Sequence, residues 1–175
     1  QTFSEMTGVP VKDILLGTDG CSAPVFAIPL VNAAHAFALL ADSSSLPEPR
    51  RSALRRIFAA MTTYPNMVAG PTGFDTALMT VGKGKILSKG GAEGYQALAL
   101  LPGACGEGSP AYGITLKIAD GDQSKPERAR PVAAIEMLRR LGALDEGQVK
   151  ALSSFAARPL YNWRHIEIGE IRAAF

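Results

Sequence analysis

The sequence over residues 85–101 reads Lys85-Ile86-Leu87-Ser88-Lys89-Gly90-Gly91-Ala92-Glu93-Gly94-Tyr95-Gln96-Ala97-Leu98-Ala99-Leu100-Leu101. Its two ends, 85–88 and 95–101, are short apolar runs of the kind that form strands, and the glycines between them are typical of a turn. A third run, 112–119, alternates isoleucine and leucine with polar residues. The three runs together predict an antiparallel meander.

Helical patterns lie on both sides of these strands. We expect helices over 24–41, 47–63 and 75–81 before them, and over 131–141 and 145–155 after them. The segment 24–41 is apolar nearly all round, which predicts a buried helix with a buried, hydrogen-bonded His35. Residues 166–171 predict one further strand at the sheet edge. The expected fold class is therefore α+β, an antiparallel sheet of three to four strands with flanking helices.

Length and composition narrow the class of protein. The 175 residues are the size of a single domain, 1–175, and 47% hydrophobic with 19% charged residues suits a compact globule. The net charge of +2 is too small to indicate a nucleic-acid partner. The longest apolar stretch, 23–41, contains two prolines, an asparagine and a histidine, which argues against a membrane span. The two cysteines, Cys21 and Cys105, lie far apart, which favours a reducing cytoplasm over a disulfide framework.

Lys89 is the first candidate for chemistry. Glycines beside it would let a ligand or another backbone approach the ammonium group closely, because glycine has no Cβ. An amine whose pKa is lowered by burial can shuttle protons. The alternative is a solvated lysine in a turn between two strands. Ser22 is not supported as a nucleophile, since neither a GxSxG elbow nor an SxxK spacing surrounds it.

Five blocks of sequence carry a family resemblance. In chain order they are Asp19-Gly20-Cys21 with Ala23-Pro24-Val25, Pro65-Asn66-Met67-Val68-Ala69-Gly70 with Phe74-Asp75-Thr76, Lys89-Gly90-Gly91-Ala92-Glu93-Gly94, Leu116-Lys117-Ile118-Ala119-Asp120-Gly121-Asp122 with Ala129-Arg130-Pro131, and Gly169-Glu170-Ile171-Arg172. Together they resemble the C-terminal half of the L-asparaginase II family, of the rhizobial inducible type. The resemblance extends over essentially the whole chain and departs from the family at residues 71–73, where a Gly-Arg-type turn is expected.

The resemblance implies a fold like that of serine β-lactamases and glutaminases, and the hydrolysis of L-asparagine to L-aspartate and ammonia. The family's chemistry is attributed to serine–lysine tandems whose serines lie in its N-terminal half. We therefore expect this chain to be the C-terminal half of a larger amidohydrolase, inactive without the serine-bearing half. By position, the resemblance makes Lys89 the catalytic lysine, Asp19 a substrate-binding residue and Cys21 a metal ligand, with zinc as the expected cofactor.

Each of these residues also has a structural interpretation. Lys89 would either deprotonate a serine or orient it as a cation. Cys21 is either a thiolate ligand that other groups complete into a metal site, or a small buried thiol. Asp19 can orient a substrate ammonium group, but Asp-Gly also marks a tight turn. Glu93 is expected to pair with Lys89 or to anchor the glycine turn.

The expected small-molecule partner is L-asparagine, with a homo-oligomer or a complementary N-terminal fragment as the macromolecular partner. A rival hypothesis from another class is a non-catalytic subdomain that pairs with a partner chain or self-associates through an open sheet edge. The sequence leaves the choice between asparagine and glutamine open.

Overall fold

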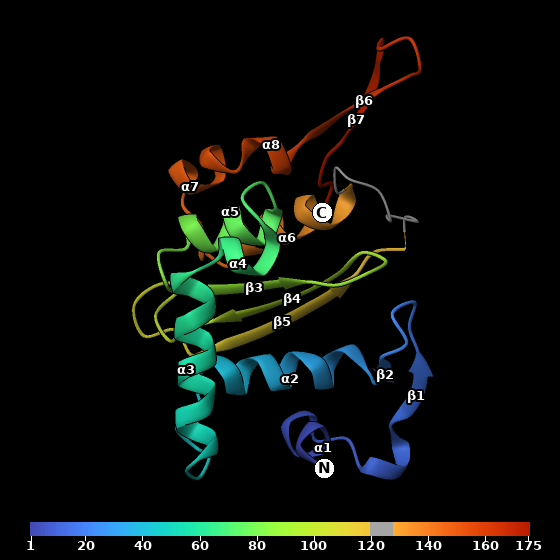
Figure 1. Cartoon of the computed structure of the whole chain (residues 1–175). Helices are drawn as coiled ribbons and strands as arrows, with labels where there is room; N and C mark the ends of the chain where they lie inside the picture. The colour runs from blue at the N-terminus through green and yellow to red at the C-terminus, as the bar shows by residue number, and fades with distance from the viewer. Residues whose placement is uncertain (120–127) are drawn as a thin grey trace.

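The computed structural model describes residues 1–119 and 128–175 (Figure 1). Its elements in chain order are α1 (Thr2–Thr7), a 3-10 helix (Val11–Asp13), β1 (Leu15–Thr18), β2 (Pro24–Ala27), α2 (Leu30–Ala41), α3 (Arg50–Thr63), α4 (Asn66–Ala69), α5 (Phe74–Val81), β3 (Ile86–Gly90), β4 (Tyr95–Leu100), β5 (Tyr112–Lys117), α6 (Ala129–Arg140), α7 (Glu146–Ala151), α8 (Ser153–Ala156), β6 (Arg158–Tyr161) and β7 (Glu167–Ile171). The predicted α+β class is confirmed.

The central sheet is the predicted meander. Its strands lie in the order β3-β4-β5, and both pairs are antiparallel. Lys89 stands opposite Ala97, and Gln96 stands opposite both Gly90 and Leu116. Two separate hairpins, β1–β2 and β6–β7, complete the strands of the described residues.

Helices cover both faces of the central sheet (Figure 1). On one face, α5 and α6 pack against it around a core that includes Phe74, Leu98 and Leu138. On the other face, α2 and α3 pack against Leu87 and its neighbours. Full burial of each large apolar side chain stabilises the fold by about 1.5–3 kcal/mol. Alternate residues of one strand lie in different cores, because successive side chains of a strand point to opposite faces of the sheet.

Helix α2 approaches β5 more closely than a side chain would permit. A Cβ placed on Gly113 would lie 1.8 Å from the carbonyl oxygen of Ala34. Thr115 of the same strand donates a hydrogen bond from Oγ1 to the carbonyl oxygen of Leu30, at 2.8 Å. A glycine is needed at this crossing because the helix backbone occupies the space that a side chain would take.

The prediction for residues 24–41 is wrong in three respects. The segment starts as strand β2, and α2 begins only at Leu30, directly after Pro29. Proline has no N–H to donate and its ring clashes with the preceding turn, so the helix cannot extend back through it. Within α2 only Ala41 is buried, and His35 is exposed rather than buried. Helix α2 meets the sheet with one side, and Asn32 also ties it to α1 by donating a hydrogen bond from Nδ2 to the carbonyl oxygen of Thr7 at 2.9 Å.

The strand predicted at 166–171 exists as β7, but it does not join the central sheet. It pairs with β6 instead, antiparallel, to form a hairpin that extends away from the helices (Figure 1). The side chain of Asn162 fixes the connecting loop, since its Oδ1 accepts hydrogen bonds from the backbone N–H groups of Arg164 and Ile166. A short loop closes at a lower entropic cost than a long connection back to the sheet.

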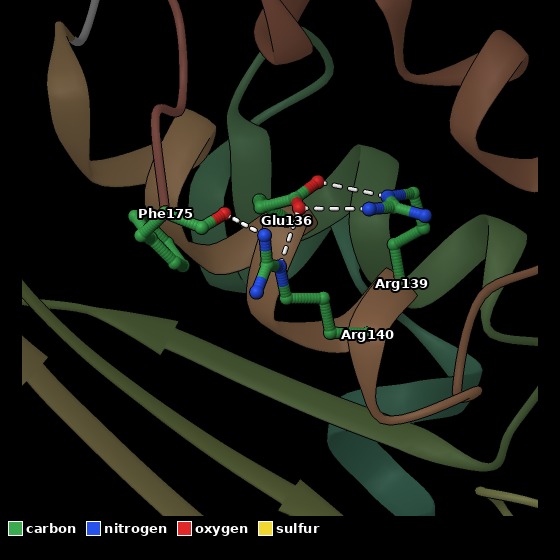
Figure 2. Close-up of polar contacts among 4 residues, drawn as sticks. All are labelled: Glu136, Arg139, Arg140 and Phe175. Carbon is green, nitrogen blue, oxygen red and sulfur yellow. Dashed lines mark hydrogen bonds and ion pairs between the residues drawn. The ribbon is translucent and has the colours of Figure 1, made fainter.

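The C-terminal residues return to α6 (Figure 2). Arg139 and Arg140 both donate hydrogen bonds to Glu136, at 2.7–2.8 Å. Arg140 also donates to the backbone oxygen of Phe175, and its guanidinium carbon lies 5.6 Å from the centroid of that ring. The two guanidinium groups lower the pKa of Glu136 to about 2.

None of the helices within residues 1–119 and 128–175 is long and apolar enough to cross a lipid bilayer.

Candidate functional site

A cavity of about 750 Å³ opens beside the end of β3. Helix α4 and the start of α5 form one wall, and the residues from Lys89 to Ala92 form a second. Arg130 of α6, Phe155 of α8 and Arg158 of β6 complete the lining. The cavity therefore draws together segments that lie far apart in the sequence.

Among the residues that the structure describes, the ionisable groups of this lining are mainly cationic: Lys89, Arg130 and Arg158 face it together with the carboxylate of Asp75. Guanidinium and ammonium groups bind carboxylates through charge-assisted hydrogen bonds. The cavity is thus suited to a small molecule that carries a negative charge.

Asp75 lies at the centre of a buried polar network. It is 5% exposed, and Ser88 and Gln96 beside it are completely buried. Its Oδ1 accepts hydrogen bonds from Ser88 Oγ at 2.6 Å and from Gln96 Nε2 at 2.9 Å, and its Oδ2 accepts one from the backbone N–H of Gly90 at 2.7 Å. A buried carboxylate is costly unless it is hydrogen-bonded, and these donors satisfy both of its oxygens.

Arg130 extends the network from α6. Its Nη1 donates to Gln96 Oε1 at 2.9 Å and to the carbonyl oxygen of Tyr95 at 3.4 Å. The guanidinium crosses directly over Gly90, where an added Cβ would lie 1.7 Å from Nη1. The close approach expected at the glycines after Lys89 is therefore made, among the described groups, by this arginine side chain.

Lys89 belongs to strand β3, not to the turn that follows it. Its side chain is exposed, lines the cavity and donates a hydrogen bond from Nζ to the carbonyl oxygen of Gly90. Of the two alternatives for Glu93, the ion pair with Lys89 is wrong, because Glu93 Oε2 lies 3.5 Å from Nζ of Lys117. The solvated-turn alternative is also wrong in its placement, since the lysine is held in a paired strand.

Hydroxyl groups are scarce in the described lining. It includes Thr72 but no serine, and Ser88, next to Lys89, has no exposed surface. Ser88 therefore cannot reach a substrate without a rearrangement of the sheet.

Asp19 and Cys21 lie in the loop between β1 and β2. Both are exposed, and neither lines the cavity at Lys89. Asp19 Oδ1 accepts hydrogen bonds from Cys21 Sγ and Cys21 N, both at 2.9 Å, and from Ala23 N at 3.0 Å. These hydrogen bonds lower the pKa of Asp19, the one from the Cys21 thiol most and those from the two amides less. The geometry is that of an Asx turn, as the structural interpretation of Asp-Gly expects.

The role of Cys21 as a metal ligand stays a prediction. Its thiol is exposed, so the alternative of a small buried thiol is wrong. Within the part of the chain that the structure describes, no three histidine, cysteine, aspartate or glutamate side chains gather closely enough to hold a metal. Asp19 and Cys21 alone fall short of the four ligands of a typical zinc site.

Asp75 and Arg130 stand within the five blocks, and Ser88 and Gln96 within the stretch 85–101, but the sequence alone assigned none of the four a role. A signal was available in the strands themselves. Ser88 and Gln96 interrupt apolar runs at positions that face a core, and a polar group in such a place needs a partner. Asp75 and Arg130 lie on helices, where sequence alone does not show which residue turns toward the sheet.

Comparison with known proteins identifies the family of the chain. A search of curated proteins finds none that matches the chain. The family model described as L-asparaginase II matches residues 1–173, nearly the whole chain. The chain therefore belongs to the L-asparaginase II family.

Proposed function

We propose that the cavity at Lys89 is part of the active site of an amidohydrolase that converts L-asparagine to L-aspartate and ammonia. The observation that carries the proposal is the position of Lys89, whose amine lines a cationic cavity in a chain of this family. The guanidinium groups of Arg130 and Arg158 suit the α-carboxylate that the substrate and the product share. Asp19 lies outside the described lining of this cavity; its role in binding the substrate ammonium group is proposed from the family resemblance and from a carboxylate whose pKa is lowered.

The proposed reaction has two steps. A hydroxyl oxygen attacks the side-chain amide carbon while the Lys89 ammonium group orients that hydroxyl, and the hydroxyl proton passes to the amide nitrogen, which leaves as ammonia. Water then hydrolyses the acyl-enzyme to release aspartate and restore the hydroxyl. Backbone N–H groups would stabilise the oxyanion that forms in each step.

The attacking serine is proposed to come from a segment encoded before Gln1. The support is the described lining, which contains no serine. We therefore expect the purified 175-residue chain to release no ammonia from L-asparagine. The protein expressed from the complete gene should release it, and L-glutamine measured in parallel gives the substrate preference. Ammonia release by the 175-residue chain, lost in Lys89→Ala, would show that the chain carries its own nucleophile.

The macromolecular partner is also a proposal. Leu15, Leu16, Val25 and Phe26 of the β1–β2 hairpin are exposed, which favours a second chain or the N-terminal half as their cover. The central sheet offers less, because α5 lies along β3 and α2 packs on β5. Native mass spectrometry of the 175-residue chain decides: a strict monomer that stays folded would count against self-association. The two free cysteines support a cytoplasmic location.

A further inference from the structure

The geometry points to Asp75 as the positioning residue for Lys89. Its carboxylate binds the residue before the lysine through Ser88 Oγ and the residue after it through Gly90 N. The inference rests on the proposed function, since it gives Asp75 a role in the reaction that Lys89 is proposed to serve.

Strand geometry explains how a residue that does not touch the substrate can place the lysine. The backbone N–H of Gly91 donates to the carbonyl oxygen of Tyr95 on β4. The neighbouring Gly90 N–H therefore points away from β4, toward the edge of β3 along which α5 lies. Asp75, in the first turn of α5, accepts that N–H at 2.7 Å. The backbone of Lys89 is therefore fixed by β4 on one side and by Asp75, through its two neighbours, on the other.

The charge of Asp75 strengthens each of these bonds. Hydrogen bonds to an ionised acceptor are shorter and roughly twice as strong as those between neutral groups. Gln96 links the carboxylate to Arg130, because its Nε2 donates to Asp75 and its Oε1 accepts from the guanidinium. Helices α5 and α6 are thus both tied to the end of β3 at the point where Lys89 enters the cavity.

Ser88 is completely buried, so its Oγ belongs to this network and not to a ligand site, and it also accepts a hydrogen bond from Gln96 Nε2 at 2.9 Å. One carboxylate thus binds the residues on both sides of Lys89, and this fixes the position of the lysine backbone. A displacement of about 1 Å in a catalytic group can cost roughly 100-fold in rate.

The test compares variants of the protein expressed from the complete gene, labelled with ¹⁵N-glycine. Asp75→Asn keeps the shape of the side chain but removes its charge. We expect kcat for L-asparagine to fall by about 10- to 100-fold, while KM changes by less than about threefold, because Asp75 already has its oxygens occupied and does not bind the substrate. The amide proton resonance of Gly90 should move upfield as its charged acceptor is lost.

Two further variants separate positioning from stability. Ser88→Ala removes one of the two anchors and should lower kcat by a smaller factor than Asp75→Asn; it decides the question if Asp75→Asn does not fold. Asp145→Ala removes the side-chain cap of α7, away from the cavity, and should lower Tm without changing kcat.

The outcomes are distinct. An active wild-type protein whose kcat is unchanged in Asp75→Asn, or in Ser88→Ala where only that variant folds, would overturn the inference and leave the proposed function standing. An unmoved Gly90 resonance in Asp75→Asn would also overturn it. A wild-type protein without activity on L-asparagine would overturn the proposed function, and the inference with it.

Discussion

The absence of a side chain at Gly90 leaves the space that the Arg130 guanidinium occupies. The Arg130 guanidinium lies where a Cβ on residue 90 would be, so any larger residue must displace it from Gln96. The sequence indicated that something approaches this glycine closely, but it could not indicate that an arginine from α6 does so. Local sequence shows the need for space and not the group that fills it.

Replacement of this glycine should therefore destabilise the protein. We expect Gly90→Ala to lower the free energy of unfolding by about 1–3 kcal/mol, the usual cost of overpacking. Gly20→Ala is the matched control, because a Cβ on Gly20 would meet nothing within 4 Å. Its free energy of unfolding should change by less than about 1 kcal/mol. Urea denaturation measures both, and equal effects of the two variants would show that Arg130 can move aside freely.

At the scale of the element, periodicity predicted the central strands and most helices, because those patterns are local. It missed strands β1, β2 and β6, and it found β7 without its partner. Strand β2 begins with a proline and β6 has one at its second position, and proline lowers the strand signal of a short segment. The partner of β7 could not be predicted either, since strand pairing depends on which loop closes first.

Helix α6 carries a pH-dependent contact at its end (Figure 2). The pKa of Glu136 falls from its ordinary value of 4.5 to about 2 in the folded chain, because Arg139 and Arg140 bind its ionised form. A lowered pKa stabilises the folded state above the ordinary value, and this contribution is lost as the pH falls through the folded value. The stabilisation from Glu136 should thus be complete above about pH 5 and disappear toward about pH 2.

Glu136→Gln tests this contact. The difference in Tm between wild type and variant should be largest near neutral pH and shrink as the solution is acidified from about pH 5 to about pH 2. The effect is modest because the groups are at the surface. Glu107→Gln, in the exposed loop after β4, is the control for the loss of one surface carboxylate. A Tm difference independent of pH would contradict the lowered pKa.

At the scale of the whole molecule, the cavity could not be derived from the sequence. Lys89 lines the cavity, and the catalytic role that the resemblance implies for it stays a prediction. The remaining walls come from α4, α5, α6, α8 and β6, whose approach to β3 depends on the packing of two separate cores. The expected roles of Asp19 and Cys21 stay predictions. Their loop joins β1 and β2, a hairpin that the sequence did not indicate.

The proposed reaction depends most on the Lys89 amine, and one measurement tests the role of that amine directly. Ammonia release from L-asparagine is followed for the protein expressed from the complete gene, as wild type and as Lys89→Met, which keeps a chain of similar length without the charge. The wild type should be active and the variant should lose about 10²- to 10⁴-fold in kcat, with Tm little changed because the side chain is exposed. A variant that hydrolyses L-asparagine at the wild-type rate would contradict the account.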